Sequence, residues 1–391
     1  MATTTVSEKP RSITSNAVVG GLALLALAGF VTLIYRLSIG LGPTTNLSDY
    51  YPWGLWIGFD FTLIAFSGGA FSLVLIVHMF NLKRFLPVLR LAVLTGWLGY
   101  ISVAVILIAD LGRWDRFWHF LVYPNIHSPM FEISWCLFLY SGVLTLEIAP
   151  IFFEKFRKPN IANTFHKLVI PLAFIGVILS LLHQSTLGTL YVAMPDRIHP
   201  LWYTPLMPVL FLISAIGLGL SGVILAALIA GWVFHRPVKM KVLEGLAYGV
   251  LWIWVVYLAF KLEHLIFSGL IDNLFSFGRV SFWFLVEFAL MVIVPIGLLS
   301  VARFRSNRFW LFVATLSAVI GTTLNRFNVT FTAQSVGGIW TMEVLADKAT
   351  YWPSWIEMLI QAGVLAAAVL AWYLAIRYLP ILPEKAQSRS S

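Results

Sequence analysis

Two glutamates interrupt the apolar stretch from His127 to Glu154, HSPMFEISWCLFLYSGVLTLEIAPIFFE. The stretch is long and apolar enough to form a helix that crosses a bilayer. Glu132 and Glu147 are roughly 22 Å apart along such a helix, at ~1.5 Å per residue. An ionised carboxylate in hydrocarbon is costly, so such residues commonly face a cavity or a partner. We interpret both as proton-exchanging groups at two depths; the alternative is that they hydrogen-bond neighbouring helices for packing.

The composition excludes a soluble protein. Of the 391 residues, 60% are apolar and only 11% are charged, and the mean hydropathy is +0.88. A soluble domain has about 25% charged residues. The single cysteine, Cys136, excludes a four-cysteine iron–sulfur cluster and an internal disulfide. We therefore predict an all-α, polytopic membrane protein, and the polar N-terminus followed by a full-length span predicts no cleaved signal peptide.

Hydropathy predicts ten spans, which two four-helix bundles and two flanking helices would accommodate. The expected spans are roughly 17–37, 53–79, 87–110, 129–153, 166–190, 203–234, 241–265, 281–302, 308–327 and 355–378. The sixth contains Pro205 and Pro208, so its first turns are expected in the interface or beside a cavity. The implied divisions are a tail (1–16), the first span and loop (17–52), the bundles (53–190 and 191–327), an outer loop (328–354), and the last span with its tail (355–391).

The basic residues predict the orientation. Eighteen of the 26 lysines and arginines fall in the two tails and the even-numbered loops. The positive-inside rule therefore places both termini in the cytoplasm, and the net charge of +9 does not indicate nucleic-acid binding. The odd-numbered loops are longer and rich in aromatics and proline. They indicate that a partner or redox donor docks outside; the alternative is that they only cap the bundle.

Four consecutive spans, from the second to the fifth, send polar side chains to a similar outer level. These side chains are Asp60, Tyr100, Asp110, Arg113, Glu132 and His183. A packed apolar bundle does not need them, whereas a cavity for a polar head group does. Towards the inner side, Glu147 and His78 would form a track for protons with water. Lys261, Glu263 and His264 crowd the outer end of the seventh span, where we expect them at the interface.

Several segments resemble the NrfD/PsrC family of integral membrane subunits. They are PWGLWIGFDF, ADLGRW, MFEISWCLFLYSGVLTLEIAP, LHQSTLGTLYV, HPLW, YWPSWIEMLI and YLPILP. Within the family, the resemblance is nearest to the HybB-type membrane subunits of periplasmic nickel–iron hydrogenases, with the DsrP and HmcC types as close rivals. The resemblance implies two four-helix bundles in a prokaryotic cytoplasmic membrane, and a site for menaquinone or ubiquinone near the extracytoplasmic face.

The resemblance also implies partners and roles. An extracytoplasmic, ferredoxin-like iron–sulfur subunit and a catalytic or cytochrome subunit would complete a respiratory oxidoreductase, with no haem, iron–sulfur cluster or other metal in this chain. Carried onto matching positions, the quinone-binding residues are Asp60, Tyr100, Arg113, Glu132 and His183. Glu147, with His78 and Asp110, would belong to a proton pathway. Arg113 could hold Asp60 or Asp110 ionised, or favour a semiquinone anion. The sequence permits proton translocation without requiring it.

Two alternatives to this function stay open at the level of sequence. A proton-coupled secondary transporter would also have many spans and buried carboxylates, and typically repeats with helices broken near the midplane. A purely structural anchor would tolerate replacement of those carboxylates. A haem between His183 and His264 is a further possibility, although haem needs two axial ligands that face each other.

Overall fold

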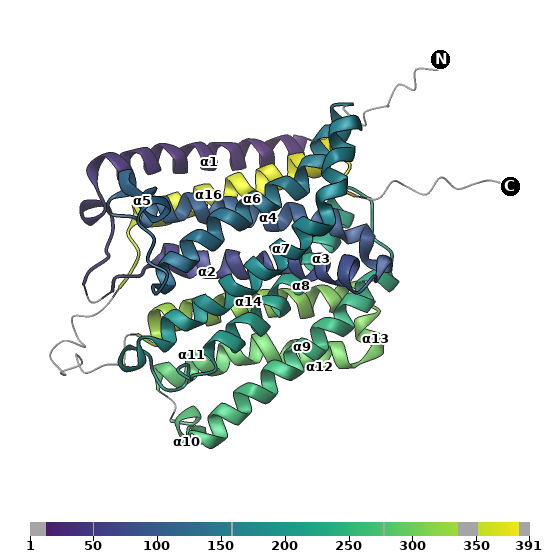
Figure 1. The fold of residues 1–391 in the computed structure, drawn as a ribbon. Coiled ribbons are helices and arrows are strands. Elements are labelled where there is room, and N and C mark those ends of the chain that lie inside the picture. The colour runs from purple at the N-terminus through teal and green to yellow at the C-terminus, as the bar shows by residue number, and fades with distance from the viewer. Residues whose placement is uncertain (1–12, 50, 158, 277, 335–350, 383–391) are drawn as a thin grey trace, which may run out of the picture.

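The computed structural model describes the chain except for residues 1–12, 50, 158, 277, 335–350 and 383–391. Within the described residues the structure has helices and no strand, and the long helices lie side by side as one bundle (Figure 1). Nine of the described helical segments are long and apolar enough to cross a membrane. They are Asn16–Ile39, Leu55–Met79, Lys83–Asp110, Pro129–Lys155, Lys167–Val192, Met207–Val233, Met240–Phe267, Arg279–Ser300 and Trp355–Tyr378.

The described elements follow one another along the sequence with short connections. The helices are α1 (Ile13–Ile39), α2 (Leu55–Phe66), α3 (Gly68–Val74), α4 (Leu86–Asp110), α5 (His119–Val122), α6 (Pro129–Lys155), α7 (Pro159–Val192), α8 (Met207–Val233), α9 (Met240–Phe267), α10 (Ile271–Leu274), α11 (Arg279–Phe288), α12 (Val294–Ser300), α13 (Ala302–Arg305), α14 (Arg308–Phe327) and α16 (Trp355–Tyr378). The short 3₁₀ and π segments are η1 (Gly42–Thr44), η2 (Leu75–Met79), η3 (Lys83–Phe85), η4 (Trp114–Arg116), η5 (Pro195–Arg197), η6 (Ala289–Ile293) and η7 (Asn328–Thr332).

The tenth expected span, α14, is a helix of 20 residues at the predicted bounds. It is more polar than the nine because it carries buried Thr315, Thr322, Asn325 and Arg326. It packs against α2 and α8 in the interior of the bundle, so its polar residues meet protein rather than lipid. The prediction of an all-α membrane protein with about ten spans is confirmed.

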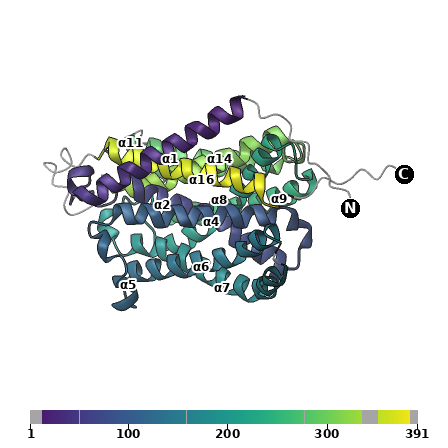
Figure 2. The ribbon, with the colours of Figure 1, turned by 90° about the horizontal axis from the view of Figure 1, so that it is seen from above.

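The helices pack mainly with their neighbours in sequence. In the first half, α4 packs on α2 and α6, and α6 packs on α7; in the second half, α8 packs on α9 and α14. The α1 and α16 helices pair with each other beside α4, as Figure 2 shows from above. Close backbone contacts need glycine at two crossings: Gly69 against Gly219 between α3 and α8, and Gly29 against Gly363 between α1 and α16.

Local sequence signals set several helix ends. Proline occupies the first turn of α4 and of α6, where its missing N–H costs no hydrogen bond. A capping box begins α16: the Ser354 hydroxyl accepts from the Glu357 N–H, and the Glu357 carboxylate accepts from the Ser354 N–H. The sixth span begins at Met207, so residues 203–206, which were expected in its first turn, lie outside the helix.

The second span is interrupted near its middle, which the sequence did not predict. Ser67 separates α2 from α3, and its hydroxyl donates to the Gly96 and Leu63 carbonyls at 3.0 Å. The interruption is one residue long, and the helical path resumes at once. A π segment, η2, then ends the span. This is a local adjustment rather than the unwound helix of a transporter site.

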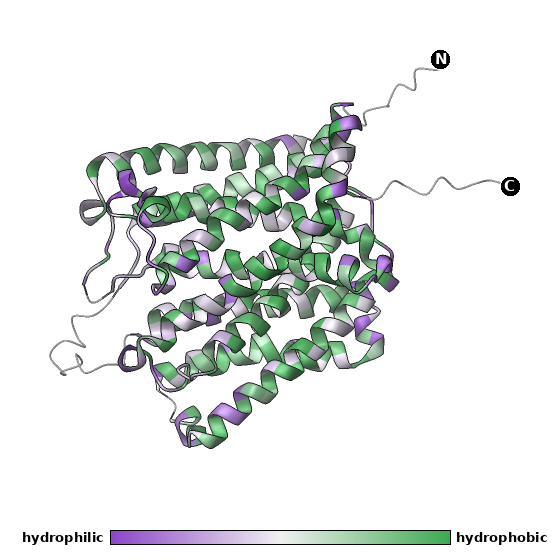
Figure 3. Ribbon diagram, viewed as in Figure 1, coloured by the Kyte–Doolittle hydropathy of each residue, from purple (hydrophilic) through white to green (hydrophobic). Residues whose placement is uncertain are grey.

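The surface matches a protein that crosses a bilayer several times. Hydrophobic residues cover the helices between the two ends of the bundle, and hydrophilic residues gather at those ends (Figure 3). The start of α1 and the finish of α16 lie at the same end, and α5 and α10 lie at the other (Figure 1). The protein is thus a multi-pass membrane protein. The side on which its termini lie stays a prediction.

Candidate functional site

A tyrosine and a histidine meet in the interior of the first half. The Tyr100 hydroxyl of α4 lies 3.0 Å from Nδ1 of His183 on α7, and both residues are fully buried. The ring of Tyr140 on α6 meets Tyr100 edge-on, with centroids 4.7 Å apart. Three helices therefore converge on Tyr100. Nε2 of His183 is buried and has no hydrogen-bond partner in the described part of the protein. If Tyr100 donates to Nδ1, the neutral ring carries its proton on Nε2 and can donate it to a ligand.

Asp60 on α2 is a second buried polar group without a partner. The residue is 1% exposed, and neither carboxyl oxygen has a hydrogen-bond partner among the described residues. Four residues later, the Ile64 carbonyl accepts from Gln184, the neighbour of His183, and this contact ties α2 to α7. Leaving a buried polar group unsatisfied costs about 1–3 kcal/mol, so Asp60 needs a ligand or ordered water.

Glu132 lies at the entrance of this region. It is half-buried in the first turn of α6, where the positive end of the helix dipole favours a carboxylate. Cys136 and Tyr140 follow on the same face of the helix. Eight residues separate Glu132 from Tyr140, which is roughly 12 Å along α6. The geometry therefore places Glu132 nearer the outer end of the helix than the Tyr100–His183 pair.

Glu147 and His78 lie together on the inner side. They line one cavity of about 230 Å³ between α3, η2, α4, α6 and α7, and Arg90 of α4 also lines it. Arg90 forms a two-pronged ion pair with Glu154, with nitrogen–oxygen distances of 3.0 and 3.1 Å. The two inner residues that the sequence singled out for protons thus share one space.

Asp110 ends α4 beside an arginine that the sequence patterns did not single out. Arg36 of α1 is fully buried and donates through Nη2 to the Leu111 carbonyl at 2.8 Å. Arg36 and Asp110 are close enough to interact electrostatically, and so are Asp110 and Asp60. Glu357 of α16 is the fourth charged group at this helix junction. The only signal for Arg36 in the sequence was a lone basic residue on the outer side of an otherwise apolar span.

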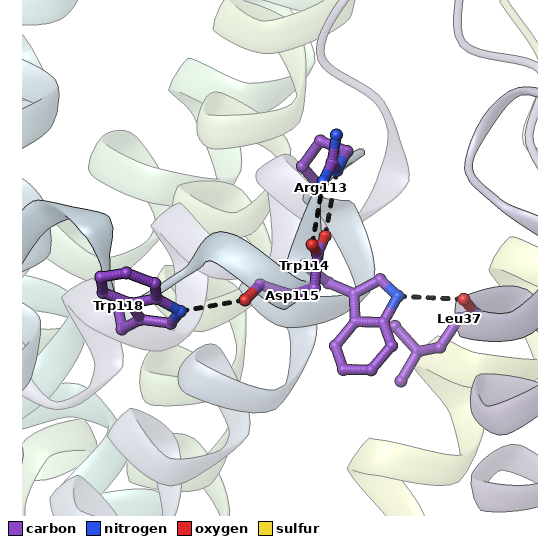
Figure 4. Close-up of polar contacts among 5 residues, drawn as sticks. All are labelled: Leu37, Arg113, Trp114, Asp115 and Trp118. Atoms are coloured by element: carbon purple, nitrogen blue, oxygen red, sulfur yellow. Dashed lines mark hydrogen bonds and ion pairs between the residues drawn. The ribbon is translucent and has the colours of Figure 1, made fainter.

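The prediction that Arg113 serves Asp60 or Asp110 is wrong. Arg113 lies in the exposed loop after α4 and pairs with Asp115, with nitrogen–oxygen distances of 3.1 and 3.0 Å (Figure 4). These hydrogen bonds raise the pKa of Arg113 and lower the pKa of Asp115. Trp114, between them, points away and donates to the Leu37 carbonyl at the end of α1. The α4 helix ends at Asp110 and Leu111 is extended, so Arg113 lies in the exposed loop that follows, and Arg36 takes the place beside Asp110.

The expectation for the outer end of the seventh span is also largely wrong. Glu263 is exposed, but Lys261 and His264 are buried in the second half of the bundle. Lys261 donates to the Leu201 carbonyl at 2.6 Å and lies 3.4 Å from Nδ1 of His264.

Since the described part of the protein has no group of three or more His, Cys, Asp or Glu residues that could hold a metal ion, no metal centre is assigned.

The family described as "Polysulphide reductase, NrfD" matches residues 43–337, which is more than half of the sequence. The chain belongs to the NrfD family. This confirms the resemblance that the sequence motifs indicated. The match includes all the residues that converge near Tyr100, but not Arg36 or α16.

Several relatives match over nearly the whole length of the protein. The chain is 29% identical over 364 residues to the "Probable Ni/Fe-hydrogenase 2 b-type cytochrome subunit" of Escherichia coli, covering 91% of this chain and 90% of that protein. It is 30% identical over 387 residues to the "Menaquinone reductase, integral membrane subunit" of Nitratidesulfovibrio vulgaris, covering 90% and 88%. It is 24% identical over 391 residues to the "Hdr-like menaquinol oxidoreductase integral membrane subunit" of Archaeoglobus fulgidus, covering 93% of each. These three relatives are named as parts of oxidoreductases, and none of them as a transporter.

Proposed function

We propose that this chain is the membrane subunit of a respiratory oxidoreductase complex and exchanges electrons between a partner subunit and the membrane quinone pool. The observation that supports it most is the buried Tyr100–His183 pair, which leaves one imidazole nitrogen free of protein partners. Membership of the NrfD family and the menaquinone reductase relative support the same assignment. The electron donor or acceptor is an extracytoplasmic iron–sulfur subunit, joined by a catalytic or cytochrome subunit.

The quinone-binding residues in this proposal are Asp60, Tyr100, Glu132 and His183. Reduction of a quinone takes two electrons and two protons, so each carbonyl oxygen needs a hydrogen-bond donor that can be reprotonated. His183 supplies the donor at Nε2, and Tyr100 fixes the ring by its bond to Nδ1. Asp60 and Glu132 hold protons near the site. Arg113 has no part in it, because its side chain is paired with Asp115 in the outer loop.

Protons also reach the site from the inner side through Glu147 and His78. The cavity that these two residues line supports this route, because it brings both to one space at the inner end of the first half. The termini are cytoplasmic in this proposal, and the membrane is the cytoplasmic membrane of a prokaryote. The outer polar side chains of the first half, residues 53–190, then face the side where the partner docks.

We further propose that the protein binds neither haem nor an iron–sulfur cluster, although the E. coli relative is named as a b-type cytochrome subunit. Nδ1 of His183 is held by Tyr100, and Nδ1 of His264 lies against Lys261. The two histidines lie in different halves of the bundle, so we do not assign them as a pair of axial ligands. The single cysteine, Cys136, cannot ligate a four-cysteine cluster.

The test uses the purified complex in two steps. A reduced-minus-oxidised visible spectrum, assigned by subunit, together with quinone extraction should show bound quinone and no b-type haem in this subunit. Tyr100→Phe should then reduce quinone turnover by about 10²-fold, because it releases the imidazole from its proton-transfer geometry. Tyr248→Phe is the matched control, since Tyr248 is half-exposed on α9. Equal turnover in both variants would contradict the proposed site, and a haem band in this subunit would contradict the cofactor assignment.

A further inference from the structure

Seven buried polar atoms at one junction of four helices lack protein partners among the residues that the structure describes. They are Nε and Nη1 of Arg36, both carboxyl oxygens of Asp60, Oδ1 of Asp110, and both amide atoms of Gln361. Arg36 and Gln361 are 0% and 2% exposed. The four residues come from α1, α2, α4 and α16. Buried polar atoms in folded proteins almost always have partners, so this concentration needs a physical explanation.

The four residues lie around one junction of helices, which we call the outer chamber. Asp110 interacts electrostatically with Arg36 and with Asp60. Each chamber residue also lies close in its own helix to a member of one apolar cluster. The cluster contains Leu33, Trp56, Ile106, Ala109, Ile356 and Ile360. This apolar cluster joins the four helices, so the polar residues beside it meet at the same level.

The charges in the outer chamber favour water as its occupant. Arg36 already supplies a positive charge next to Asp110, so a metal ion would be repelled. Glu357 does not compete for the chamber, because its oxygens accept from the Asn46 and Ser354 N–H groups and from the Tyr351 hydroxyl. Buried water typically makes about three hydrogen bonds to groups that are otherwise unsatisfied, which is what these side chains offer.

The depth of each residue orders the outer chamber along the membrane normal. Asp110 ends α4 at the outer side, and Asp60 lies five residues into α2 from the same side, which is roughly 7 Å. Tyr100 lies ten residues inside the end of α4, roughly 15 Å deep. Asp60 is therefore at an intermediate depth between the outer end of the helices and the Tyr100–His183 pair.

We propose that Arg36, Asp60, Asp110 and Gln361 enclose ordered water through which Asp60 exchanges protons with the outer aqueous phase. This inference rests on the proposed quinone function and adds an outer route to it. Each step passes one proton between neighbouring oxygens, and the electrons come from the partner subunit. The positive charge of Arg36 stabilises ionised Asp110, while Asp60 alternates between its protonated and ionised forms. The charged groups around Asp60 are Asp110 on α4 and Arg36 on α1. Glu357, in the first turn of α16, lies beyond them.

The outer route affects whether quinone reduction separates charge across the membrane. Protons that enter through the cavity of Glu147 cross most of the membrane before they reach the quinone. Protons that enter through the outer chamber do not. The two routes end near the same site from opposite sides, so the relative rates of proton transfer through them determine whether quinone reduction separates charge across the membrane.

The experiment measures quinone turnover, quinone affinity and the solvent isotope effect in the assembled complex carrying Gln361→Leu or Asp60→Asn. Gln361→Leu replaces the amide with an apolar group of similar size. Turnover should fall about tenfold to a hundredfold in both variants, because proton exchange becomes rate-limiting. The deuterium isotope effect should rise in both variants. The affinity for a fluorescent quinone analogue should stay unchanged in Gln361→Leu, because Gln361 is not one of the proposed quinone-binding residues. Met358→Leu, on an exposed position of the same helix, is the control.

Two results would overturn the outer chamber. Unchanged turnover in both variants would show that no catalytically relevant proton passes through it. Loss of turnover in Gln361→Leu with an equal loss of quinone affinity would assign Gln361 to head-group binding. Tyr100→Phe, measured in parallel, separates the two proposals: if it leaves turnover intact, the quinone site itself is wrong, whatever the chamber variants show.

Discussion

Two clusters of buried charge lie in the two halves of the bundle, and they differ in whether their polar groups have hydrogen-bond partners in the protein. In the second half, the Glu287 carboxylate accepts from Trp202 at 2.8 Å, Asn325 at 2.9 Å and Asn328 at 2.6 Å. In the first half, the Asp60 carboxyl accepts from no protein group among the described residues. Both residues are at most 3% exposed.

The other charges in each half follow the same contrast. Arg326 donates to Ser214 at 2.7 Å and lies over the Phe211 ring, and only its Nε lacks a partner within the described part of the protein. Arg36 leaves Nε and Nη1 without partners there. A cluster whose members satisfy one another holds helices in place, whereas one that leaves groups free can serve a substrate or water. The comparison therefore assigns structure to the second half and chemistry to the first.

The largest expected effect is on stability, in the second half. Glu287→Ala removes the acceptor of three hydrogen bonds and leaves Lys261 and Arg326 as buried positive charges. We expect a loss of about 3–5 kcal/mol, since breaking a buried ionic network is strongly destabilising. Thermal unfolding of the purified complex measures it, with Glu263→Ala as the exposed control. If both variants unfold at the wild-type temperature, the cluster does not hold the helices.

The opposite sign is expected for Asp60. Asp60→Leu removes a buried carboxyl that has no protein partner among the described residues, so the free energy of unfolding should stay level or rise, by at most about 1–3 kcal/mol, the usual cost of an unsatisfied group. Quinone turnover should fall in the same sample. The same unfolding assay, followed by an activity assay, checks both. A variant that is less stable than the wild type would show that Asp60 has a structural role like that of Glu287.

A smaller effect is expected at the inner end, where Arg90 and Glu154 pair. Both side chains are partly exposed, so Glu154→Gln should change the free energy of unfolding by no more than about 1 kcal/mol. Unfolding at two salt concentrations measures this, because screening weakens an exposed pair. A loss as large as that of Glu287→Ala would remove the distinction between exposed and buried charge on which the comparison depends.

The smallest effect is expected at the outer loop, and it concerns the pH dependence of the free energy of unfolding. Arg113 lowers the pKa of Asp115 through their hydrogen bonds. A carboxyl with a lowered folded-state pKa stabilises the protein above its unfolded pKa of about 3.9, and this contribution is lost as the pH falls through the folded value. Asp115→Asn should therefore leave the pH dependence of unfolding unchanged between about pH 5 and 8. A new slope in that range would contradict the assignment.

The sequence predicted the helices well because length and hydropathy determine which segments can cross a bilayer. Asp60, Tyr100 and His183 were also found, because a polar side chain in an apolar span is conspicuous. Their pairing could not be predicted: Tyr100 and His183 lie on helices separated by a third span, and only packing brings their side chains within 3.0 Å.

The errors have physical causes. Arg113 closely follows the end of α4, but it pairs with Asp115 in an exposed loop, and sequence alone does not give the conformation of a loop. Lys261 and Arg36 lie near helix ends, where a basic residue often extends to the interface, yet neighbouring helices bury both. Gln361 carries no charge, so it gave no signal until its buried amide was seen without partners.

One pair of variants tests the central claim most directly, because a buried histidine lies at the outer level of each half. Quinone turnover per assembled complex should be compared for His183→Gln and His264→Gln. The account predicts that His183→Gln loses turnover by about 10²-fold or more. It predicts that His264→Gln keeps the wild-type turnover. Equal losses, or a larger loss for His264→Gln, would contradict the assignment of the chemistry to the first half.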